Sequence, residues 1–203
     1  MRTTLSFFVL PSLIGCAPTA YSYSGYWASK HFPITPAEWT YSNETEDYGM
    51  KVTVVSTEQE NGTTVASFDY LNSDEDDALL YSIKWSSDDN NGIQVHGYAL
   101  DDGSWVNFSS PVQIAERQVE PGDISETTVD NHSYVADFET YEDCKNVSAQ
   151  SWTCMKVVIS SDEANPAPFL GTWHWATEYG TSIFQPVDAE TPWKLVTHEL
   201  ILE

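Results

Sequence analysis

Apolar and polar residues alternate along most of this chain, and a period of two is typical of β-strands with one buried face. In one segment, Tyr81, Ile83 and Trp85 are separated by single polar residues. Asn-Gly and Asp-Gly pairs, which favour tight hairpin turns, stand between several of these segments. The pattern therefore predicts antiparallel strands joined by short turns.

Strands are expected from Trp39 onward, with little that could be helix. Residues 111–129 are less clear, because 113–118 fits either a strand or one helical turn. No internal repeat or linker divides the chain. We therefore expect an all-β fold over 30–203, either a single antiparallel β-sandwich or an open (half) barrel. The expected strands are 50–56, 62–70, 78–86, 93–101, 133–141, 151–160, 170–176, 182–187 and 193–202.

The Asn61-Gly62 turn also predicts a register for the two strands beside it. A two-residue loop at this point would place Val55 opposite Phe68. Both side chains would then lie on the same face of the sheet.

The first residues fit an export signal. Arg2 supplies a positive start, and an apolar run of about ten residues follows from Leu5 to Ile14. Such a run suits the core of a signal peptide and is too short to span a bilayer, which takes roughly 20 residues. We therefore expect an exported chain, with 1–15 as the signal peptide.

The run ends in Leu13-Ile14-Gly15-Cys16, which resembles the lipobox of bacterial lipoproteins. In that family the cysteine is diacylated and the peptide bond before it is cut. The resemblance implies that Cys16 carries lipid, that 16–29 is a tether, and that the membrane is a partner through this anchor. In lipoproteins of Gram-negative bacteria, which this chain resembles, Ala17 in place of aspartate implies the outer membrane. An ordinary secretory signal, cut after Ala17 or Ala20, is the alternative.

The cysteine count agrees with a lipid on Cys16. If that residue is modified, Cys144 and Cys154 are the two cysteines left to pair. Their spacing suits a cross-link between neighbouring antiparallel strands, which would stabilise the fold by about 3 kcal/mol at most. Exported proteins seldom keep unpaired thiols, so we expect a disulfide. Neither a CxxC nor an HExxH pattern of a zinc site is present.

Phe32-Pro33-Ile34 followed by Trp39-Thr40-Tyr41 opens the expected domain, and Gly171–Ala176 lies near its end. These segments resemble a loose group of bacterial cell-envelope lipoproteins, which have a Phe-Pro-Leu segment, a Trp-x-Tyr strand and a Gly-x-Trp-x-Phe-Ala strand. This chain departs from that pattern at Ile34, and at Ala37, where the group often has glycine. The resemblance implies an antiparallel β domain and names no activity.

The chain is strongly acidic, with 8 Lys and Arg against 31 Asp and Glu and a net charge of −23. Such a surface repels nucleic acid and anionic headgroups and attracts cations. Aromatic residues make up 13% of the sequence, including eight tryptophans, which excludes a disordered acidic tail. We therefore expect a folded domain with no nucleic-acid partner.

Two acidic turns are candidates for a Ca²⁺ site. In a simple meander of strands they would share one end of the sheet, and Ca²⁺ takes six to eight oxygen ligands from flexible loops. No segment matches the spaced EF-hand pattern, and acidic turns without a metal are the alternative, because Asp favours turns by itself. No other cofactor is expected. The candidate ligands are Asp74, Asp76, Asp77, Asp101 and Asp102.

Trp173 and Trp175 lie two residues apart, so they share one face of a strand. On an exposed face the pair could stack on sugar rings, whereas in the core the same pair would be ordinary packing. His174 then lies on the opposite face. Like His96 and His198, it has no partner that the sequence identifies.

No sequence motif for catalysis is present. The chain contains no Gly-x-Ser-x-Gly elbow and no phosphate-binding loop, and its many carboxylates make any chosen catalytic pair arbitrary. We therefore expect that it is not an enzyme.

The expected function is a non-catalytic binding or interaction module of the cell envelope, with an envelope protein, a glycan or an apolar ligand as partner. A carrier or sensor of an apolar ligand in an open half-barrel is the alternative. Five Asn-x-Ser/Thr sequons, at Asn43, Asn61, Asn107, Asn131 and Asn146, support a further one, a secreted eukaryotic N-glycoprotein. A roomy concavity would favour the carrier, and a closed, well-packed sandwich would leave only surface binding.

Overall fold

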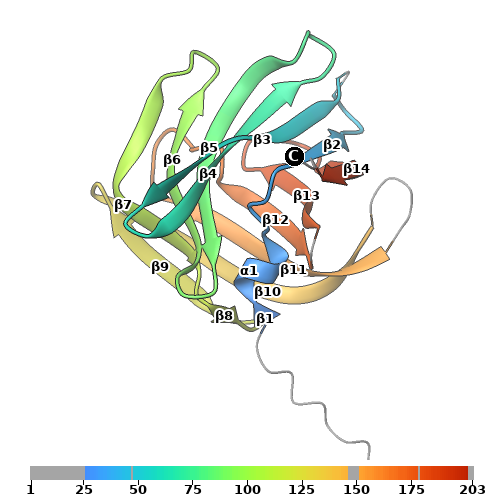
Figure 1. Ribbon diagram of the computed structural model, residues 1–203. Coiled ribbons are helices and arrows are strands. Elements are labelled where there is room, and N and C mark those ends of the chain that lie inside the picture. The colour runs from blue at the N-terminus through green and yellow to red at the C-terminus, as the bar shows by residue number, and fades with distance from the viewer. Residues whose placement is uncertain (1–25, 47, 146–150, 178, 201–203) are drawn as a thin grey trace, which may run out of the picture.

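The structure of the protein is a computed structural model that describes residues 26–46, 48–145, 151–177 and 179–200. Twelve antiparallel strands form one large sheet that curves into a nearly closed barrel (Figure 1). The expectation of an all-β fold is confirmed. No helix in the described residues is long and apolar enough to cross a membrane.

The strands follow the alternating segments of the sequence, and the ambiguous region 111–129 contains the end of one long strand and two further strands. Three short elements lie outside the large sheet: the paired strands β1 (Tyr26–Trp27) and β8 (Gln118–Val119), and the helical turn α1 (Ala28–His31). The strands of the large sheet are β2 (Ala37–Ser42), β3 (Met50–Glu60), β4 (Thr63–Asn72), β5 (Ala78–Asp88), β6 (Gly92–Leu100), β7 (Trp105–Ala115), β9 (Ile124–Val129), β10 (His132–Lys145), β11 (Ser151–Ser161), β12 (Gly171–Ala176), β13 (Gly180–Pro186) and β14 (Trp193–Leu200).

The sheet consists of two up-and-down meanders, β2 to β7 and β9 to β14. Each strand pairs with its neighbour in the sequence, as short turns between antiparallel strands dictate. The meanders join where β2 pairs with β14, so the first and the last strand of the large sheet lie side by side. In Figure 1 this junction lies where the blue and red strands meet.

The opposite junction, between β7 and β9, has no β-ladder, and side chains close it instead. The amide of Gln113 donates to Oγ1 of Thr127 at 3.2 Å, and Oγ of Ser125 donates to the Gln113 carbonyl at 3.0 Å. Farther along, the amide of Ser109 donates to the Asp130 carboxylate at 3.1 Å. We call this junction the seam.

Aromatic side chains fill the interior between the meanders. Trp85 on β5 packs against Trp173 on β12 with ring centroids 5.9 Å apart, and Tyr70 on β4 packs against Phe184 on β13 at 6.1 Å. The inner faces of the two halves therefore contact each other as the layers of a sandwich do. This arrangement combines the two architectures that the sequence left open.

The segment before β2 is part of this core. Ala28 in α1 is fully buried. Phe32, which follows the end of α1, packs against one ring from each meander: its ring centroid lies 4.8 Å from that of Trp85 and 5.4 Å from that of Trp175. In Figure 1, α1 lies between the green and the orange strands. Residues 26–29 of the expected tether are thus paired or packed in the structure.

The predicted register of the β3–β4 hairpin is correct near the turn and wrong beyond Ser56. Ser56 pairs with Ser67 as the two-residue turn requires, but a bulge then shifts the ladder, and Val54 rather than Val55 faces Phe68. Val55 is the extra residue, and its side chain is 53% exposed. The bulge keeps the apolar residues on the far side of it directed into the core.

Candidate functional site

The outer face of strands β3 to β7 carries a continuous band of polar side chains. Residues such as Phe68, Ile83 and Val95 point into the core, so their neighbours on each strand point outward. Several of these polar side chains are nevertheless covered by their neighbours: Ser82 is 3% exposed and Ser86 is fully buried. We call this surface the polar face. Its members are Ser56, Glu58, Glu60, Ser67, Asp69, Ser82, Lys84, Ser86, Gln94, His96, Trp105 and Asn107.

A groove of about 420 Å³ crosses the polar face beside Trp105. Trp105 begins β7 and pairs with Ala99, whose small side chain leaves the indole standing above the sheet with 39% of its surface exposed. We call this space the Trp105 groove. It is lined by Val55, Ser56, Glu58, Ser67, Asp69, Leu79, Ser82, Lys84, Ala99, Gly103 and Trp105.

Lys84 organises the charges of the groove. Its ammonium lies 5.0 Å from the centroid of the Trp105 ring and 2.8 Å from a Glu58 carboxylate oxygen. The hydrogen bond from Lys84 lowers the pKa of Glu58, so this carboxylate stays ionised. Asp69 accepts a hydrogen bond from Ser82 at 2.7 Å. The groove therefore offers one oriented aromatic ring with fixed donors and acceptors beside it.

A second, more polar cavity of about 580 Å³ shares Lys84 with the groove and lies toward the Asn61 and Asn91 turns. His96 lines it and is held in a chain of hydrogen bonds, with Nδ1 3.1 Å from the Glu60 carboxylate and Nε2 2.9 Å from the Ser86 hydroxyl. Burial lowers the pKa of His96, and the facing Glu60 carboxylate opposes that shift.

The order Ser86–His96–Glu60 matches that of a hydrolase triad, but the surroundings of Ser86 do not suit a nucleophile. Its side chain is fully buried, so a substrate has no approach to the hydroxyl. It also lies within β5 between β4 and β6, where the ladders occupy the backbone amides that an oxyanion hole would need. The chain of hydrogen bonds therefore serves to orient His96 at the cavity wall.

Trp173 and Trp175 are 1% and 0% exposed, so the expectation that they stack on a ligand is corrected to core packing. Trp173 stacks on Phe184 with centroids 4.9 Å apart, and its indole nitrogen donates to the Phe169 carbonyl at 2.9 Å. Alternation fixed their common face but could not tell which face is buried.

The acidic turns do not converge on a metal site. Asp77 forms an ion pair with Lys51, Asp74 accepts a 3.2 Å bond from the Gly49 amide, and Asp102 accepts from the Ser104 amide at 2.8 Å. These carboxylates, with Asp76 and Asp101, belong to no cluster of three donor atoms within 4.8 Å among the described residues. The contacts of these carboxylates are therefore the ones expected of acidic residues that stabilise turns.

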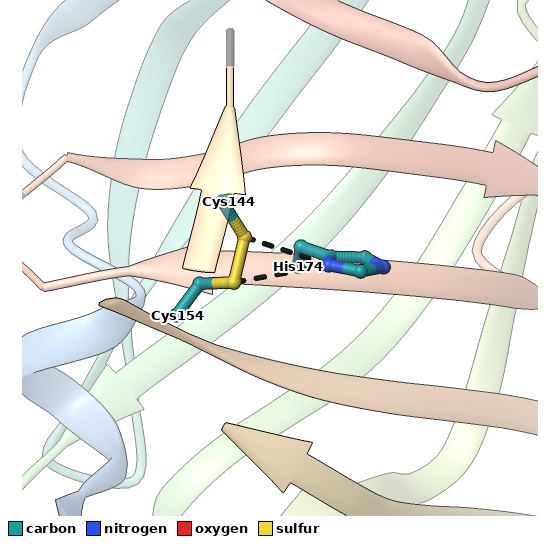
Figure 2. Close-up of side chains that lie close together, drawn as sticks. All are labelled: Cys144, Cys154 and His174. Atoms are coloured by element: carbon teal, nitrogen blue, oxygen red, sulfur yellow. Dashed lines mark hydrogen bonds between the residues drawn. A yellow bond between two sulfur atoms is a disulfide. The ribbon is translucent and has the colours of Figure 1, made fainter. Parts of the chain in front are cut away.

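Cys144 and Cys154 form the expected disulfide between β10 and β11, with Cα atoms 5.9 Å apart. Figure 2 shows that the imidazole of His174 on β12 points at this bond. Nδ1 of His174 lies 3.4 Å from the Cys144 sulfur and 3.8 Å from the Cys154 sulfur. The sequence had left His174 without a partner, because only the register of three strands brings the residues together.

The interior contains a small cavity lined by Phe32, Trp39, Phe68 and Tyr70, which is too small for a ligand. The cavity there measures about 10 Å³, close to the minimum for a single water. Ligand pockets usually enclose about 300–1,000 Å³. The core at this point is therefore packed rather than hollow, unlike the concavity that a carrier of apolar ligands needs.

Sequence reasoning missed Trp105, Lys84 and His96 as site residues. The signal that could have found them is the regular recurrence of polar residues on one face of five consecutive strands. Cys16, the expected lipidation site, lies outside the described residues.

No protein-family model matches this sequence, and no curated protein matches it significantly. One similar solved structure is a putative lipoprotein from Parabacteroides distasonis, with 12% identity over 82% of this chain and 95% of that one, at a TM-score of 0.38. Another is a putative exported protein with a YmcC-like fold from Bacteroides fragilis, with 12% identity over 86% of this chain and 99% of that one, at a TM-score of 0.42. At these values no residue of this chain takes a role from either structure.

Proposed function

We propose that this chain is an exported, non-catalytic binding module, anchored to the bacterial outer membrane by lipid on Cys16, whose polar face takes a neutral oligosaccharide. The observation that carries the ligand class is the Trp105 groove. The apolar face of a sugar ring packs on an exposed indole, while its hydroxyl groups bond to nearby polar side chains. Ser56 is exposed and Asp69 is half-buried, and they supply such groups along the groove.

Charge favours a neutral ligand over an acidic one. Glu58, Glu60 and Asp69 flank the single ammonium of Lys84 on this part of the polar face. The whole chain carries a net charge of −23, so an anionic glycan would meet repulsion both at the groove and at a distance.

The ligand proposal is tested on an array of neutral, acidic and amino-sugar oligosaccharides, followed by calorimetry with the best neutral one. Trp105→Ala should weaken that binding by about tenfold or more, or ~1.4 kcal/mol. Tyr179→Ala is the matched control, since Tyr179 is 38% exposed but belongs to the turn between β12 and β13. Equal affinity in both variants, or no binding to any neutral glycan, would contradict the proposal.

The anchor is tested separately by the intact mass of the protein purified from its native membrane. A diacyl or triacyl adduct on a chain that begins at Cys16 is the expected result. A lipid-free, heterogeneous mass with a sugar addition at the sequons would instead indicate the secreted glycoprotein. The outcome of this measurement is independent of the glycan experiment.

A further inference from the structure

The contact between His174 and the disulfide sets the Cys144–Cys154 pair apart from a purely structural cross-link. Three adjacent strands, β10, β11 and β12, each supply one donor side chain, and all three point to the same side of the sheet (Figure 2). Both cysteines are at most 2% exposed, whereas His174 is half-buried. In the described residues this is the group of three metal-ligating side chains whose donor atoms lie within 4.8 Å of one another.

We propose that the disulfide and a bound Zn²⁺ ion are alternative occupants of this position. When a thiol reductant opens the disulfide, the Cys144 and Cys154 thiolates and Nδ1 of His174 form a three-ligand zinc site. This proposal does not depend on glycan binding, because it concerns the other meander.

Two of the three ligand separations already suit the ion. Zinc binds thiolate at about 2.3 Å and imidazole at about 2.0–2.1 Å in tetrahedral geometry, which places nitrogen and sulfur about 3.5 Å apart. The measured separations from Nδ1 are 3.4 Å to Cys144 and 3.8 Å to Cys154. In a tetrahedral site the two sulfurs lie roughly 3.8 Å apart, so they must separate once the disulfide is opened. The Cα atoms of the two cysteines are 5.9 Å apart, and rotation of the side chains about χ1 allows this separation.

The surroundings agree with a soft divalent ion. Two thiolates and an imidazole select zinc over Ca²⁺ or Mg²⁺, which prefer oxygen ligands. Lys156 pairs with His174 across the ladder, but its ammonium is bonded to Glu139 at 2.5 Å, which offsets its charge. A water molecule would complete the tetrahedron as the fourth ligand, as in sites with three protein ligands.

The chemistry balances with the reductant named. Two thiol groups of the reductant become its disulfide, and the Cys144–Cys154 bond takes up their two electrons and two protons to give two cysteine thiols. Binding of Zn²⁺ then releases the two thiol protons to solvent. A disulfide-bearing oxidant reverses the exchange, re-forms the bond and expels the ion.

The test uses the full chain with Cys16→Ser, which removes the third thiol of the sequence. The protein is reduced with dithiothreitol, freed of reductant without air, and titrated with Co²⁺ as a spectroscopic substitute for Zn²⁺. We expect one equivalent to bind, with a sulfur-to-cobalt charge-transfer band and the intense visible bands of a tetrahedral site. The oxidised protein should show neither band.

The ligand role of the imidazole is tested with His174→Ala in the same background. Loss of a supporting partner costs about 10–100-fold in metal affinity, so loss of a direct ligand should cost at least that much. His132→Ala is the matched control, because His132 begins β10 with a 44% exposed side chain and should leave binding unchanged.

Zinc should also slow alkylation of Cys144 and Cys154 in the reduced parent protein, as measured by peptide mass spectrometry. This second measurement does not require the His174→Ala variant to fold. Equal cobalt affinity in His174→Ala and the parent would overturn the proposal. Absence of a thiolate band in the reduced parent, or alkylation at the same rate with and without zinc, would also overturn it.

Discussion

Trp173 and Trp105 occupy opposite environments, although both lie in strands of the same sheet. Trp173 is 1% exposed and touches aromatic rings of both meanders, whereas Trp105 is 39% exposed and stands over Lys84. Burial therefore makes one of them part of the core and leaves the other free to meet a ligand. The same residue type contributes to stability in one place and, under the proposed function, would contact the ligand in the other.

This contrast predicts different effects of the same truncation. Trp173→Ala should lower the free energy of unfolding by about 3–5 kcal/mol, because it empties a large volume in the packed interior. Trp105→Ala should change it by less than about 1 kcal/mol, as surface substitutions usually do. Urea denaturation followed by circular dichroism measures both. A similar loss in the two variants would mean that Trp105 is not the exposed ring described above.

The histidines predict how the fold responds to acid. Burial lowers the pKa of His31 and of His96 below the ordinary 6.5, although the Trp27 carbonyl and Glu60, respectively, oppose the shift. Below pH 6.5 the unfolded chain therefore binds protons that the folded chain does not. The stability that comes from keeping these rings neutral is present above pH 6.5 and is lost as the pH falls toward their folded pKa values.

His96→Gln should accordingly flatten the decline in unfolding free energy below pH 6.5 relative to the parent. Lys84, Glu58 and Glu60 all act on this ring in the fold, so the difference between variant and parent is the informative quantity. His132→Gln, at an exposed position, is the control. Parallel pH profiles for parent and His96→Gln would show that His96 is not the group responsible.

At the scale of elements, the seam differs from every other junction of the barrel. Elsewhere neighbouring strands are joined by ladders of backbone hydrogen bonds, whereas at the seam the backbone amide of Gln113 donates its hydrogen bond to the side-chain hydroxyl of Thr127. Hydrogen bonds of this kind are fewer than those of a ladder, so the seam should open locally before the rest of the sheet.

Thr127→Val tests this dependence, because it keeps the shape of the side chain and removes the hydroxyl. The Gln113 amide would then lose its partner, at a cost of about 1–3 kcal/mol, and its hydrogen exchange should accelerate. Thr128→Val on the same strand is the control, since Thr128 is exposed. Unchanged exchange at Gln113 in Thr127→Val would mean that the amide is protected in another way.

The elements themselves were largely predictable, because alternation and turn residues are local signals. The strands from Met50 to Leu100 and their order follow from sequence alone, as does the Cys144–Cys154 bond. The bulge at Val55 was not predictable, since an extra residue in a ladder depends on how the far end packs. The contact of His174 with the disulfide was also hidden, because it requires the registers of two ladders together.

At the scale of the whole molecule, charge is the dominant feature. With 31 acidic against 8 basic residues, most carboxylates have no cation to pair with, and the folded body repels itself. The ion pairs that do form lie at the surface, such as Lys84 with Glu58 and Lys194 with Glu44. Surface pairs of this kind contribute only about 0–1 kcal/mol each.

Salt should therefore stabilise the fold. Raising the ionic strength from about 0.01 M to 0.15 M shortens the Debye length from roughly 30 Å to 8 Å and screens this repulsion. The melting temperature measured by calorimetry should rise over that range with sodium chloride. A fall in melting temperature would mean that the few ion pairs outweigh the general repulsion.

The meeting of β2 with β14 has a consequence for the order of folding. Within each meander the ladders join only strands that are neighbours in the sequence, so each meander can begin to form as soon as its own strands are available. The ladder that pairs Tyr41 with Leu195 closes a loop of nearly the whole domain, and such contacts are the slowest to form. During synthesis from the N-terminus, the ladder between β2 and β14 therefore cannot form until β14 has been made. If it ends before Trp193, the edges of β2 and β13 stay unpaired and open to association with other chains.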